Sequence, residues 1–384
     1  MRKLKMGMIG GGKNAFIGAI HRIAANMDGL VELHCGAFSS NPEISRESGK
    51  ELFLPEEKCY ATYQEMIVKE SGLTAGQRMD FVTIVTPNFA HFAPAMMALD
   101  HGFHVLIDKP MTLSLDEAKQ LQQKVNETGL ILCLTHTYSG YPMVKQARKM
   151  VADNELGKIR KVMVEYTQGW LSSLFENEGN KQAIWRTDPA KSGISGCMGD
   201  IGTHAAQLAE YISGTKIIQM CADINIVVEG RKLDDDGNVL LKFDNGANGI
   251  LVATQIATGE ENGLKIKIYG EKGGLEWHQM EPNSLIIKWP DVPTQIYRTG
   301  NSYLSNNAMA NTRTPSGHPE GYLEAFANLY KNFALTLSSI LEGKTPSAEM
   351  LDFPSVDDGV RGMAFIENVI ASGKSEQKWF DFKI

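Results

Sequence analysis

The first third of the chain alternates short apolar runs with segments of helical periodicity. The apolar runs predict strands, which fall at residues 3–9, 31–38, 81–85, 104–107 and 130–134. Between them the sequence predicts helices at about 15–27, 94–102 and 114–125. Residues 81–85 (FVTIV) are apolar throughout, as is typical of a strand buried on both faces of a parallel sheet. This alternation predicts an α/β fold with a doubly wound parallel sheet.

From residue 136 onward strand-like segments dominate. They are expected at 161–168, 217–228, 238–243, 249–254, 265–269 and 284–288, with helices at 143–154, 202–213, 322–341 and 356–372. Turn signals at Asp236-Gly237, Asn245-Gly246 and Gly273-Gly274 predict hairpins. The polar stretch 300–317 resembles a long loop. We therefore expect two domains, 1–135 and 136–384, the second of them α+β with a mainly antiparallel open sheet.

Composition restricts the possible partners. A formal charge of −7 and the lack of a long Lys/Arg run argue against nucleic acid and against a charged membrane surface. No run approaches the roughly 18 apolar residues that span a bilayer. The five cysteines are far apart and form no CxxC pair, which is typical of reduced thiols and predicts a cytoplasmic protein.

A glycine-rich turn follows the first predicted strand and opens the first helix. In Gly10-x-Gly12-x-x-Ala15, small residues allow a tight turn whose backbone N–H groups approach a pyrophosphate. The alternative is an ordinary glycine turn, but the position after the first strand favours a dinucleotide. The expected contacts in this turn are Gly10, Gly12, Lys13, Asn14, Ala15 and Phe16.

The ends of the next strands supply further candidate cofactor contacts. The second strand lacks the usual ribose-binding carboxylate and carries Ser39 and Ser40 instead, with Arg46 nearby, so this motif leaves NAD and NADP both open. After the third strand comes Thr86-Pro87-Asn88-x-x-His91. Asn88 is the main candidate there, and His91 has a structural role as its alternative.

Two further clusters carry candidate chemistry. Asp108-Lys109-Pro110 ends the fourth strand, where a lysine can donate to a substrate hydroxyl oxygen and stabilise a developing alkoxide. Asp200 and His204 are four residues apart at the start of a predicted helix. The alternatives are a helix-capping Asp and a buried structural His. A metal pair is disfavoured because no further His or Cys lies at ligand spacing.

The roles of the lysine and the histidine follow from their ordinary acidities. Oxidation of a secondary alcohol requires removal of the hydroxyl proton as hydride leaves the carbon. An ordinary histidine has a pKa of about 6.5 and an ordinary lysine about 10.4. We therefore expect His204 to be the base, Lys109 the charged donor, and Asp200 the group that holds His204 or a neighbouring hydroxyl.

In this order and spacing the motifs resemble the Gfo/Idh/MocA oxidoreductases, named for glucose–fructose oxidoreductase and inositol dehydrogenase. The resemblance covers essentially the whole chain and includes Trp185-Arg186-x-Asp188-Pro189. It implies a Rossmann domain followed by an open antiparallel sheet that often packs in dimers or tetramers. It also implies a catalytic set of Lys109, Asp200 and His204, and it places Asp108 and Lys109 against the cofactor.

Other segments are similar to a narrower branch of that family. They are the extended start at 10–22, Ala37-Phe38-Ser39-Ser40, and Thr135-His136-x-Tyr138-x-Gly140-Tyr141-Pro142. The branch includes levoglucosan dehydrogenase, the L-glucose and scyllo-inositol dehydrogenases and enzymes acting at C3 of glucosides. Several of these use NAD, so the resemblance favours NAD, with NADP not excluded.

The expected substrate is a small sugar, glycoside or cyclitol. Polyol pockets combine aromatic faces with amides, carboxylates and guanidinium groups. The candidates for this wall are Lys109, Tyr138, Gln168, Trp170, Arg186, Asp200, His204 and, from the long loop, His318. Two alternatives to a dehydrogenase stay open at this point: an NAD-dependent glycosidase that oxidises C3 transiently, and a nicotinamide-bound sensor without catalysis.

Overall fold

The computed structural model describes residues 2–13 and 15–384, and it divides into two compact units. The first contains the residues up to 137 together with Tyr322–Val360, and the second contains Tyr138–Gly321 with Arg361–Ile384. The sequence predicted one boundary at 135/136, whereas each unit in the structure consists of two segments of the chain. Residues 322–360 return to the first unit because their apolar side chains pack on its sheet.

The first unit is built on a five-stranded sheet with the order β2-β1-β3-β4-β5. All of its strand pairs are parallel, as predicted. The strands are β1 (Leu4–Gly10), β2 (Val31–Ala37), β3 (Phe81–Val85), β4 (His104–Ile107) and β5 (Leu132–Leu134). Every residue of β3 and β4 is buried, which explains why those segments are apolar without interruption.

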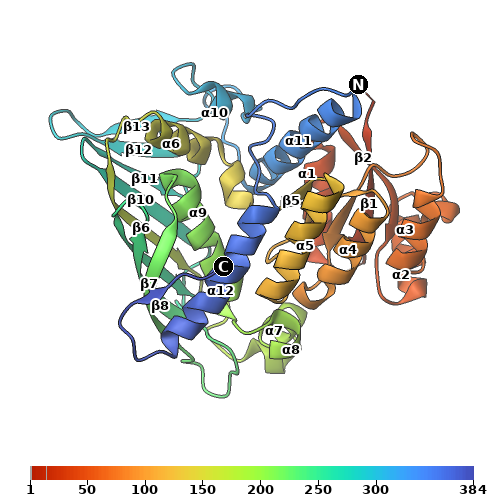
Figure 1. Cartoon of the computed structure of the whole chain (residues 1–384), viewed down its shortest axis with the longest axis horizontal. Coiled ribbons are helices and arrows are strands. Elements are labelled where there is room, and N and C mark those ends of the chain that lie inside the picture. The colour runs from red at the N-terminus through yellow and green to blue at the C-terminus, as the bar shows by residue number, and fades with distance from the viewer. Residues whose placement is uncertain (1, 14) are drawn as a thin grey trace. The chain divides into compact units, whose positions relative to one another are not determined.

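Helices pack on this sheet and connect its strands. They are α1 (Phe16–Met27), α2 (Pro42–Glu51), α3 (Tyr63–Ser71), α4 (Phe92–Asp100), α5 (Leu115–Thr128) and α11 (Tyr322–Leu341), with short 3₁₀ turns at η1 (Glu56–Lys58) and η2 (Asn88–Ala90). Figure 1 shows α4 beside α5 and α1 beside α11. The Phe81 and Phe333 rings meet edge to face, with centroids 5.0 Å apart, so α11 packs directly on β3.

Helix α5 begins with a capping box. The Ser114 hydroxyl accepts from the Glu117 backbone N–H, and the Glu117 carboxylate accepts from the N–H of Leu113. The reciprocal bond thus reaches one residue further back than in the usual form of the motif.

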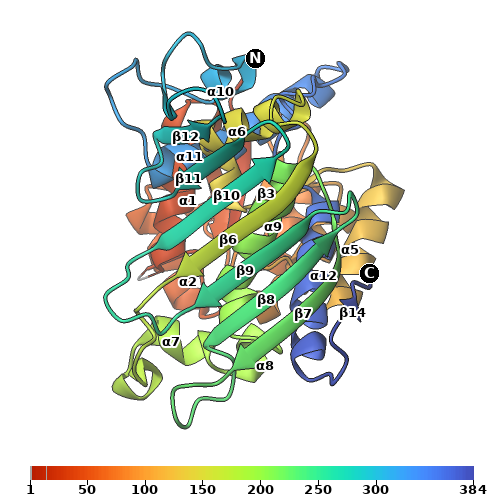
Figure 2. The same cartoon turned by 90° about the vertical axis from the view of Figure 1, so that its left-hand side faces the viewer.

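The second unit is built on a nine-stranded sheet with the order β13-β12-β11-β10-β6-β9-β8-β7-β14. Its neighbouring strands are antiparallel except for the parallel pair β6–β9, so the predicted mainly antiparallel sheet is confirmed. Figure 2 shows this sheet face on. The strands are β6 (Ile159–Thr167), β7 (Ile217–Asn225), β8 (Asp236–Phe243), β9 (Asn248–Thr254), β10 (Gly263–Gly270), β11 (Gly274–His278), β12 (Ser284–Lys288), β13 (Gln295–Arg298) and β14 (Phe380–Asp381).

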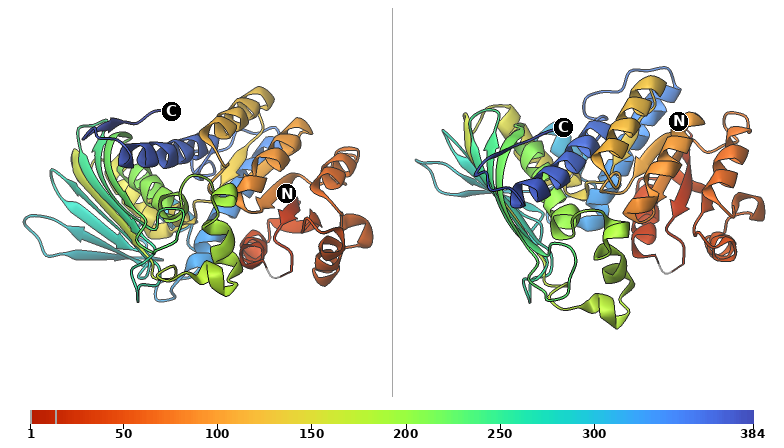
Figure 3. Two further views of the ribbon diagram at one scale, coloured as in Figure 1. Left: turned by 90° about the horizontal axis from the view of Figure 1, so that it is seen from below. Right: turned by 60° about the horizontal axis from the view of Figure 1, so that its bottom comes forward.

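Helices of the second unit cover one face of this sheet. They include α6 (Pro142–Ala152) and α9 (Thr203–Ser213), which lie on the same side of the sheet when it is seen edge on (Figure 3). The remaining elements are η3 (Thr137–Gly140), η4 (Phe175–Glu178), α7 (Lys181–Arg186), α8 (Pro189–Ser192), a π-helix η5 (Met198–Gly202), α10 (Asn306–Ala310) and α12 (Val356–Gly373), which begins in the first unit. None of the described helices combines the length and apolar character that a membrane-crossing segment needs.

Two local predictions for this unit are wrong. Asp236-Gly237 is not a turn but the start of β8, because Gly237 provides room for Met198: a Cβ there would lie 2.2 Å from the Met198 Cε. The stretch 300–317 is not entirely loop, since it contains α10, whose N-cap Ser305 accepts from the backbone N–H of Ala308.

Candidate active site

The turn after β1 brings two backbone segments unusually close. Gly10 and Gly11 have φ values of 82° and 72°, which favour glycine. A Cβ on Gly18 would lie 2.3 Å from the Gly11 Cα, so α1 starts directly against the turn. The Arg22 guanidinium, further along α1, donates to the Gly11 carbonyl at 2.6 Å and so holds the glycine turn in place. Gly18 and Arg22 are therefore structural parts of the predicted dinucleotide turn.

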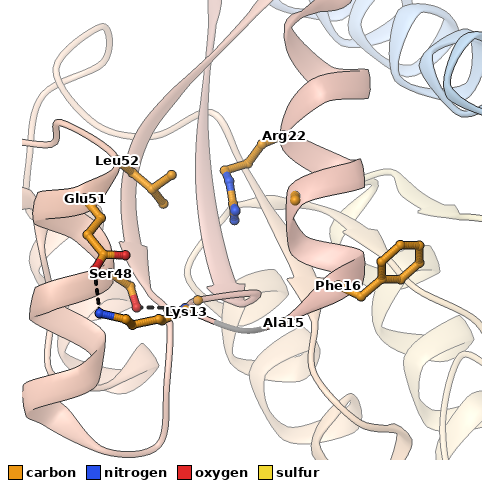
Figure 4. A pocket seen from close by; sticks show the side chains of 9 residues that line it. Lys13, Ala15, Phe16, Arg22, Ser48, Glu51 and Leu52 are labelled. Carbon is orange, nitrogen blue, oxygen red and sulfur yellow. Dashed lines mark hydrogen bonds and ion pairs between the residues drawn. The ribbon is translucent and has the colours of Figure 1, made fainter.

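A hollow of about 640 Å³ lies beside this turn (Figure 4). Lys13 pairs with Glu51 across it, with 2.7 Å between Nζ and Oε1, and the backbone N–H of Lys13 donates to the Ser48 hydroxyl. Arg22 points into the hollow, and Phe16 at the start of α1 is 67% exposed. Ala15 also lines it, whereas the predicted contact Asn14 lies outside the described residues.

The loops after β2 and β3 carry the other predicted cofactor contacts. Ser39 is half-buried and accepts from the backbone N–H of Asn41, while Ser40 is exposed. Thr86 donates its hydroxyl proton to the Ala90 carbonyl, and Asn88 is buried. Pro87 separates them in extended conformation.

His91 connects this loop to the turn after β4. Its Nδ1 lies 2.8 Å from the Pro110 carbonyl oxygen, and its Nε2 lies 2.8 Å from that of Thr86. The ring is 1% exposed, and burial lowers the pKa of His91. These contacts support the structural alternative for His91.

Asp108 braces the backbone that carries Lys109. Its Oδ1 accepts from the Lys109 N–H at 2.9 Å and from the Thr135 hydroxyl at 2.8 Å. Burial, together with the positive charge of Lys109, lowers the pKa of His136 to about 3, so a neutral imidazole lies near the lysine. Sequence reasoning quoted Thr135 and His136 only as part of a resemblance and gave them no role.

A buried histidine links Asp108 to α11. His21 of α1 has its Nε2 4.0 Å from the Asp108 Oδ2, and its Nδ1 lies 2.7 Å from the Tyr330 hydroxyl. Burial lowers the pKa of His21 to about 4, so the ring is neutral at physiological pH. Neither His21 nor Tyr330 was assigned a role from the sequence.

In the second unit, Asp200 and His204 belong to one continuous helical segment. Asp200 lies in the π-helix η5, and His204 lies in the first turn of α9. The transition is marked by the bond from the Thr203 N–H to the Met198 carbonyl, which spans five residues instead of four. Such single π turns are frequent at functional sites.

Aromatic rings surround His204, which is 7% exposed. The Tyr138 and Tyr166 ring centroids lie 4.9 and 6.3 Å from that of His204. The two tyrosine hydroxyls are hydrogen-bonded to each other, and that of Tyr166 also donates to the side-chain amide oxygen of Asn262 at 2.6 Å. Burial raises the pKa of Tyr138, so its hydroxyl keeps its proton.

The same network continues to Asp200 through amides and an arginine. The Gln168 amide donates to Asn262 at 2.8 Å and accepts from the Trp170 indole at 2.9 Å. Arg186 lies over the Trp170 ring and 3.4 Å from the Asp200 Oδ2. Gln255, which is 2% exposed, donates to that same oxygen at 2.9 Å.

Six predicted residues thus belong to one contact network in the second unit, in which Tyr166 and Asn262 link the Tyr138–His204 pair to the other four: Tyr138, Gln168, Trp170, Arg186, Asp200 and His204. His318 does not join them, since its side chain is exposed and its backbone carbonyl accepts from Thr314. Sequence reasoning missed Tyr166, Asn262 and Gln255. In the described part of the chain, no group of His, Cys, Asp and Glu could hold a metal ion.

Comparison with known proteins decides the family. Residues 4–136 match the model of the oxidoreductase family with an NAD-binding Rossmann fold, and residues 144–276 match the GFO/IDH/MocA C-terminal domain. YfiI of Bacillus subtilis, described as an uncharacterized oxidoreductase, is 32% identical over 100% of this chain and 98% of its own. The chain belongs to the Gfo/Idh/MocA family.

Two other relatives carry more specific names. An inositol dehydrogenase homologue from Azotobacter vinelandii, solved with NAD⁺, has a TM-score of 0.94 and 32% identity, covering 99% of this chain and 98% of that one. A second structure from that organism, with NADH and myo-inositol, has a TM-score of 0.91 and covers the same shares of both chains. Levoglucosan dehydrogenase of Pseudarthrobacter phenanthrenivorans is 24% identical over 99% of this chain and 98% of its own.

This Gfo/Idh/MocA chain is thus an oxidoreductase with an NAD-binding Rossmann domain. The predictions of fold class, family and NAD are confirmed. The residues of the turn fit such a cofactor: Gly10 and Gly12 border the turn closely enough that a Cβ at either would fill it, 2.9 Å from Thr86 Cγ2 and 2.7 Å from Ser48 Oγ.

The Gly11–Gly18 contact gives a direct test of the turn. We expect Gly18→Ala to weaken NADH binding at least fivefold, because the added methyl forces the turn to move, and overpacking costs about 1–3 kcal/mol. NADH titration followed by nucleotide fluorescence measures the dissociation constant.

Gly72→Ala is the matched control, since a Cβ there meets only ordinary contacts, 3.5 Å from the Lys69 carbonyl. Melting temperatures confirm that both variants are folded. Unchanged NADH affinity in folded Gly18→Ala would show that the turn does not bind the dinucleotide.

Proposed function

We propose that this protein transfers a hydride between NAD and a secondary alcohol or ketone of a sugar, glycoside or cyclitol. The observation that carries this proposal is the connected set of aromatic rings, amides, guanidinium and carboxylate around Asp200 and His204. Such a set matches the alternating hydroxyl and C–H surfaces of a polyol. Relatives named for inositol and for levoglucosan support the same substrate class.

In this proposal the first unit holds the cofactor. The turn at Gly10, Gly12, Lys13 and Ala15 receives the pyrophosphate, and the loops with Ser39, Ser40 and Asn88 border the rest of the dinucleotide. NAD supplies a hydride acceptor at the nicotinamide ring. Asp108 orients the Lys109 backbone, since it accepts from the Lys109 N–H.

The catalytic set is Lys109, Asp200 and His204. His204 takes the hydroxyl proton at its ring nitrogen, and Lys109 donates a hydrogen bond to the reacting oxygen and stabilises its developing charge. Gln255 donates a hydrogen bond to Asp200, and Arg186 forms an ion pair with it. Asp200 in turn forms a hydrogen bond with His204 or with an adjacent substrate hydroxyl. Tyr138 and Tyr166 restrict the motion of the His204 ring, because both pack against it.

In this proposal the substrate wall comprises Tyr138, Gln168, Trp170 and Arg186, and we add Tyr166 and Asn262 because they are hydrogen-bonded to these residues. Gln168 and Asn262 are already hydrogen-bonded to each other, so the wall is ordered before substrate arrives. Preorganised groups of this kind lower the entropy cost of binding. His318 is kept as a weaker candidate because it is exposed and lies outside this network.

One panel separates the dehydrogenase from its alternatives. Glucosides, inositols and anhydrosugars are incubated with NAD, and NADH absorbance is followed. Stoichiometric NADH supports the proposal. Release of reducing sugar from an aryl glycoside without net NADH would indicate the glycosidase, and NADH binding without turnover on any member would indicate a sensor.

Replacement of Lys109 tests its role in the chemistry. We expect Lys109→Ala to lower kcat by about 10²–10³-fold, the usual loss on removing an oxyanion donor, while NADH affinity is retained. Steady-state kinetics with the best panel substrate and an NADH titration give the two quantities. Near-normal turnover would remove Lys109 from the reaction.

The pH profile tests which group takes the proton. For alcohol oxidation, kcat/KM is expected to fall as pH drops through the range in which histidines ordinarily titrate, because a protonated imidazole cannot act as base. His204→Gln should abolish this acidic limb together with most activity. If the limb persists in His204→Gln and disappears only in Lys109→Ala, the two roles are reversed.

We also propose that the protein forms a homodimer or homotetramer through the open face of the nine-stranded sheet. On that face Leu240, Ile250 and Met163 are register neighbours on β8, β9 and β6, and Ile286 and Ile296 are neighbours on β12 and β13. Leu240 is 43% and Met163 38% exposed, which is unusual for large apolar side chains in a sheet centre.

Sedimentation velocity tests this assembly. The protein should sediment as a multiple of its 42.3 kDa chain, and Met163→Lys/Leu240→Lys should shift it towards the monomer. Leu341→Lys, an exposed apolar position on α11, is the control and should leave the mass unchanged. A monomeric wild-type protein would contradict the proposal.

We place this enzyme in the cytoplasm, since its five cysteines are free thiols.

A further inference from the structure

The loop 226–235, between β7 and β8, reaches two separate parts of the substrate-side network. It contains three charged side chains that are almost fully buried: Arg231 is 7%, Asp234 5% and Asp235 1% exposed. Charged side chains are rarely buried this completely unless they are paired. No role for this loop is expected from the sequence motifs.

Asp234 holds the chain where it enters the π-helix. Its carboxylate accepts from the backbone N–H groups of Gly196 and Met198, both at 2.7 Å, and from the Ser195 hydroxyl at 3.1 Å. Its carbonyl oxygen accepts from the Cys197 N–H at 2.8 Å. Four consecutive residues are therefore tied to this one aspartate.

The bonds continue to Asp200 within one turn. The Ser195 hydroxyl accepts from the Gly199 N–H at 2.9 Å, and the Asp200 N–H donates to the Gly196 carbonyl at 2.8 Å. The direction in which Asp200 leaves the helix thus depends on where Asp234 fixes residues 195–198.

The backbone of Gly196 lies directly against that of Asp234. A Cβ on Gly196 would lie 2.4 Å from the Asp234 carbonyl oxygen. Burial raises the pKa of the Asp234 carboxyl even though three hydrogen-bond donors face it, so this carboxylate costs stability when it is ionised.

Arg231 holds the segment that follows Trp170. Its guanidinium donates to the carbonyl oxygens of Leu171 at 2.8 Å and Ser173 at 2.9 Å, and it pairs with Glu176 at 3.1 Å. Asp235 anchors the arginine from within the loop, at 3.2 Å. The guanidinium reaches these four acceptors from its three nitrogen atoms, whereas an ammonium group has only three donors, all on one nitrogen.

Gln255 joins the two halves of this arrangement. Its backbone N–H donates to the Asp235 carbonyl, its own carbonyl accepts from the Leu171 N–H, and its side chain donates to Asp200. The loop, the Trp170 segment and the Asp200 carboxylate therefore form one hydrogen-bonded frame.

We propose that loop 226–235 is a positioning element of the active site, in which Asp234 sets the direction of Asp200 and Arg231 sets the place of Trp170. This inference rests on the proposed function, in which Asp200 acts in catalysis and Trp170 binds substrate. Asp234 and Arg231 are almost fully buried, and in this proposal they act only through the residues they hold.

Substitutions of Asp234 and Arg231 are expected to have different kinetic effects. Asp234→Asn replaces one acceptor oxygen by an NH₂ group that faces a backbone N–H, so we expect kcat to fall about 10–100-fold with little change in KM. Arg231→Lys keeps the charge but cannot reach all four acceptors, so we expect KM to rise about tenfold with a smaller change in kcat. NADH affinity should be unchanged in both, since the glycine turn belongs to the first unit.

A double-mutant cycle shows whether Asp234 acts through Asp200. In the Asp200→Asn background, Asp234→Asn should lower the residual kcat by less than twofold, because the group it positions is already lost. Ser195→Ala, a milder change, should lower kcat in the same direction and be equally silent in that background. It keeps the test valid if Asp234→Asn does not fold.

Glu210→Gln is the matched control. Glu210 lies on α9 with His204, and its carboxylate accepts from the Ile217 N–H and pairs with Arg361. This variant should lower the melting temperature and leave kcat and KM unchanged. If it lowers kcat as much as Asp234→Asn, the effect is general loosening of the fold, and the inference is wrong.

The remaining outcomes distinguish a failure of the proposed catalytic role of Asp200 from a failure of the positioning role of the loop. If Asp200→Asn retains full activity, the catalytic assignment in the proposed function fails. If Asp200→Asn is impaired but Asp234→Asn and Arg231→Lys match the wild type, only the positioning role fails. Full additivity of Asp234→Asn and Asp200→Asn would likewise overturn the positioning role.

Discussion

The backbone contact between Gly11 and Gly18 is the constraint on which the cofactor side of this protein depends. It allows α1 to begin directly against the end of β1, and any side chain at position 18 would meet the backbone of the turn. Once α1 is placed, His21 on its buried face reaches Asp108 on one side and Tyr330 of α11 on the other. Helix α1 thus contacts both the glycine turn and the Asp-Lys-Pro turn, and it positions them relative to each other.

The substrate side uses a different physical device. Its polar groups hydrogen-bond to one another, from Tyr138 through Asn262 and Gln168 to Trp170, so these side chains have little conformational freedom. Within a partly dry environment such networks are stronger than the same bonds in water, and a member left unpaired is costly. A ligand that offers matching hydroxyls at fixed spacing is therefore favoured over one that only fills the space.

Local signals predicted most of the fold, and the failures have identifiable causes. Strands β3 and β4 and helix α11 were found because uninterrupted apolar runs and helical periodicity need no tertiary information. Strands β11 and β13 were missed because they are short, and β13 is mostly exposed, so neither has a clear periodic pattern. Asp236-Gly237 was taken for a turn, since nothing in the sequence shows that Met198 packs against that glycine.

The candidate site divides in the same way. A motif at a strand end pointed to Lys109, and one at a helix start pointed to Asp200 and His204, but Asn262, Gln255 and Asp234 belong to no motif. Each acts through a contact with a residue far away in the sequence. Gln255 bonds Asp200 across 55 positions, Asn262 bonds Tyr138 across 124, and Asp234 bonds Ser195 across 39. Long-range pairing of this kind is decided by the sheet register and has no local signature.

The return of residues 322–360 to the first unit has a consequence for how the chain matures. The apolar face of α11 covers β1 and β3, and the segment after it pairs with the edge of β5, where Leu134 donates to the Pro354 carbonyl. During synthesis the five parallel strands emerge more than 180 residues before these covers. The first unit therefore cannot complete its fold until the second unit has almost entirely left the ribosome. Neither unit is encoded by one uninterrupted stretch of the gene, so neither can be exchanged as a single segment.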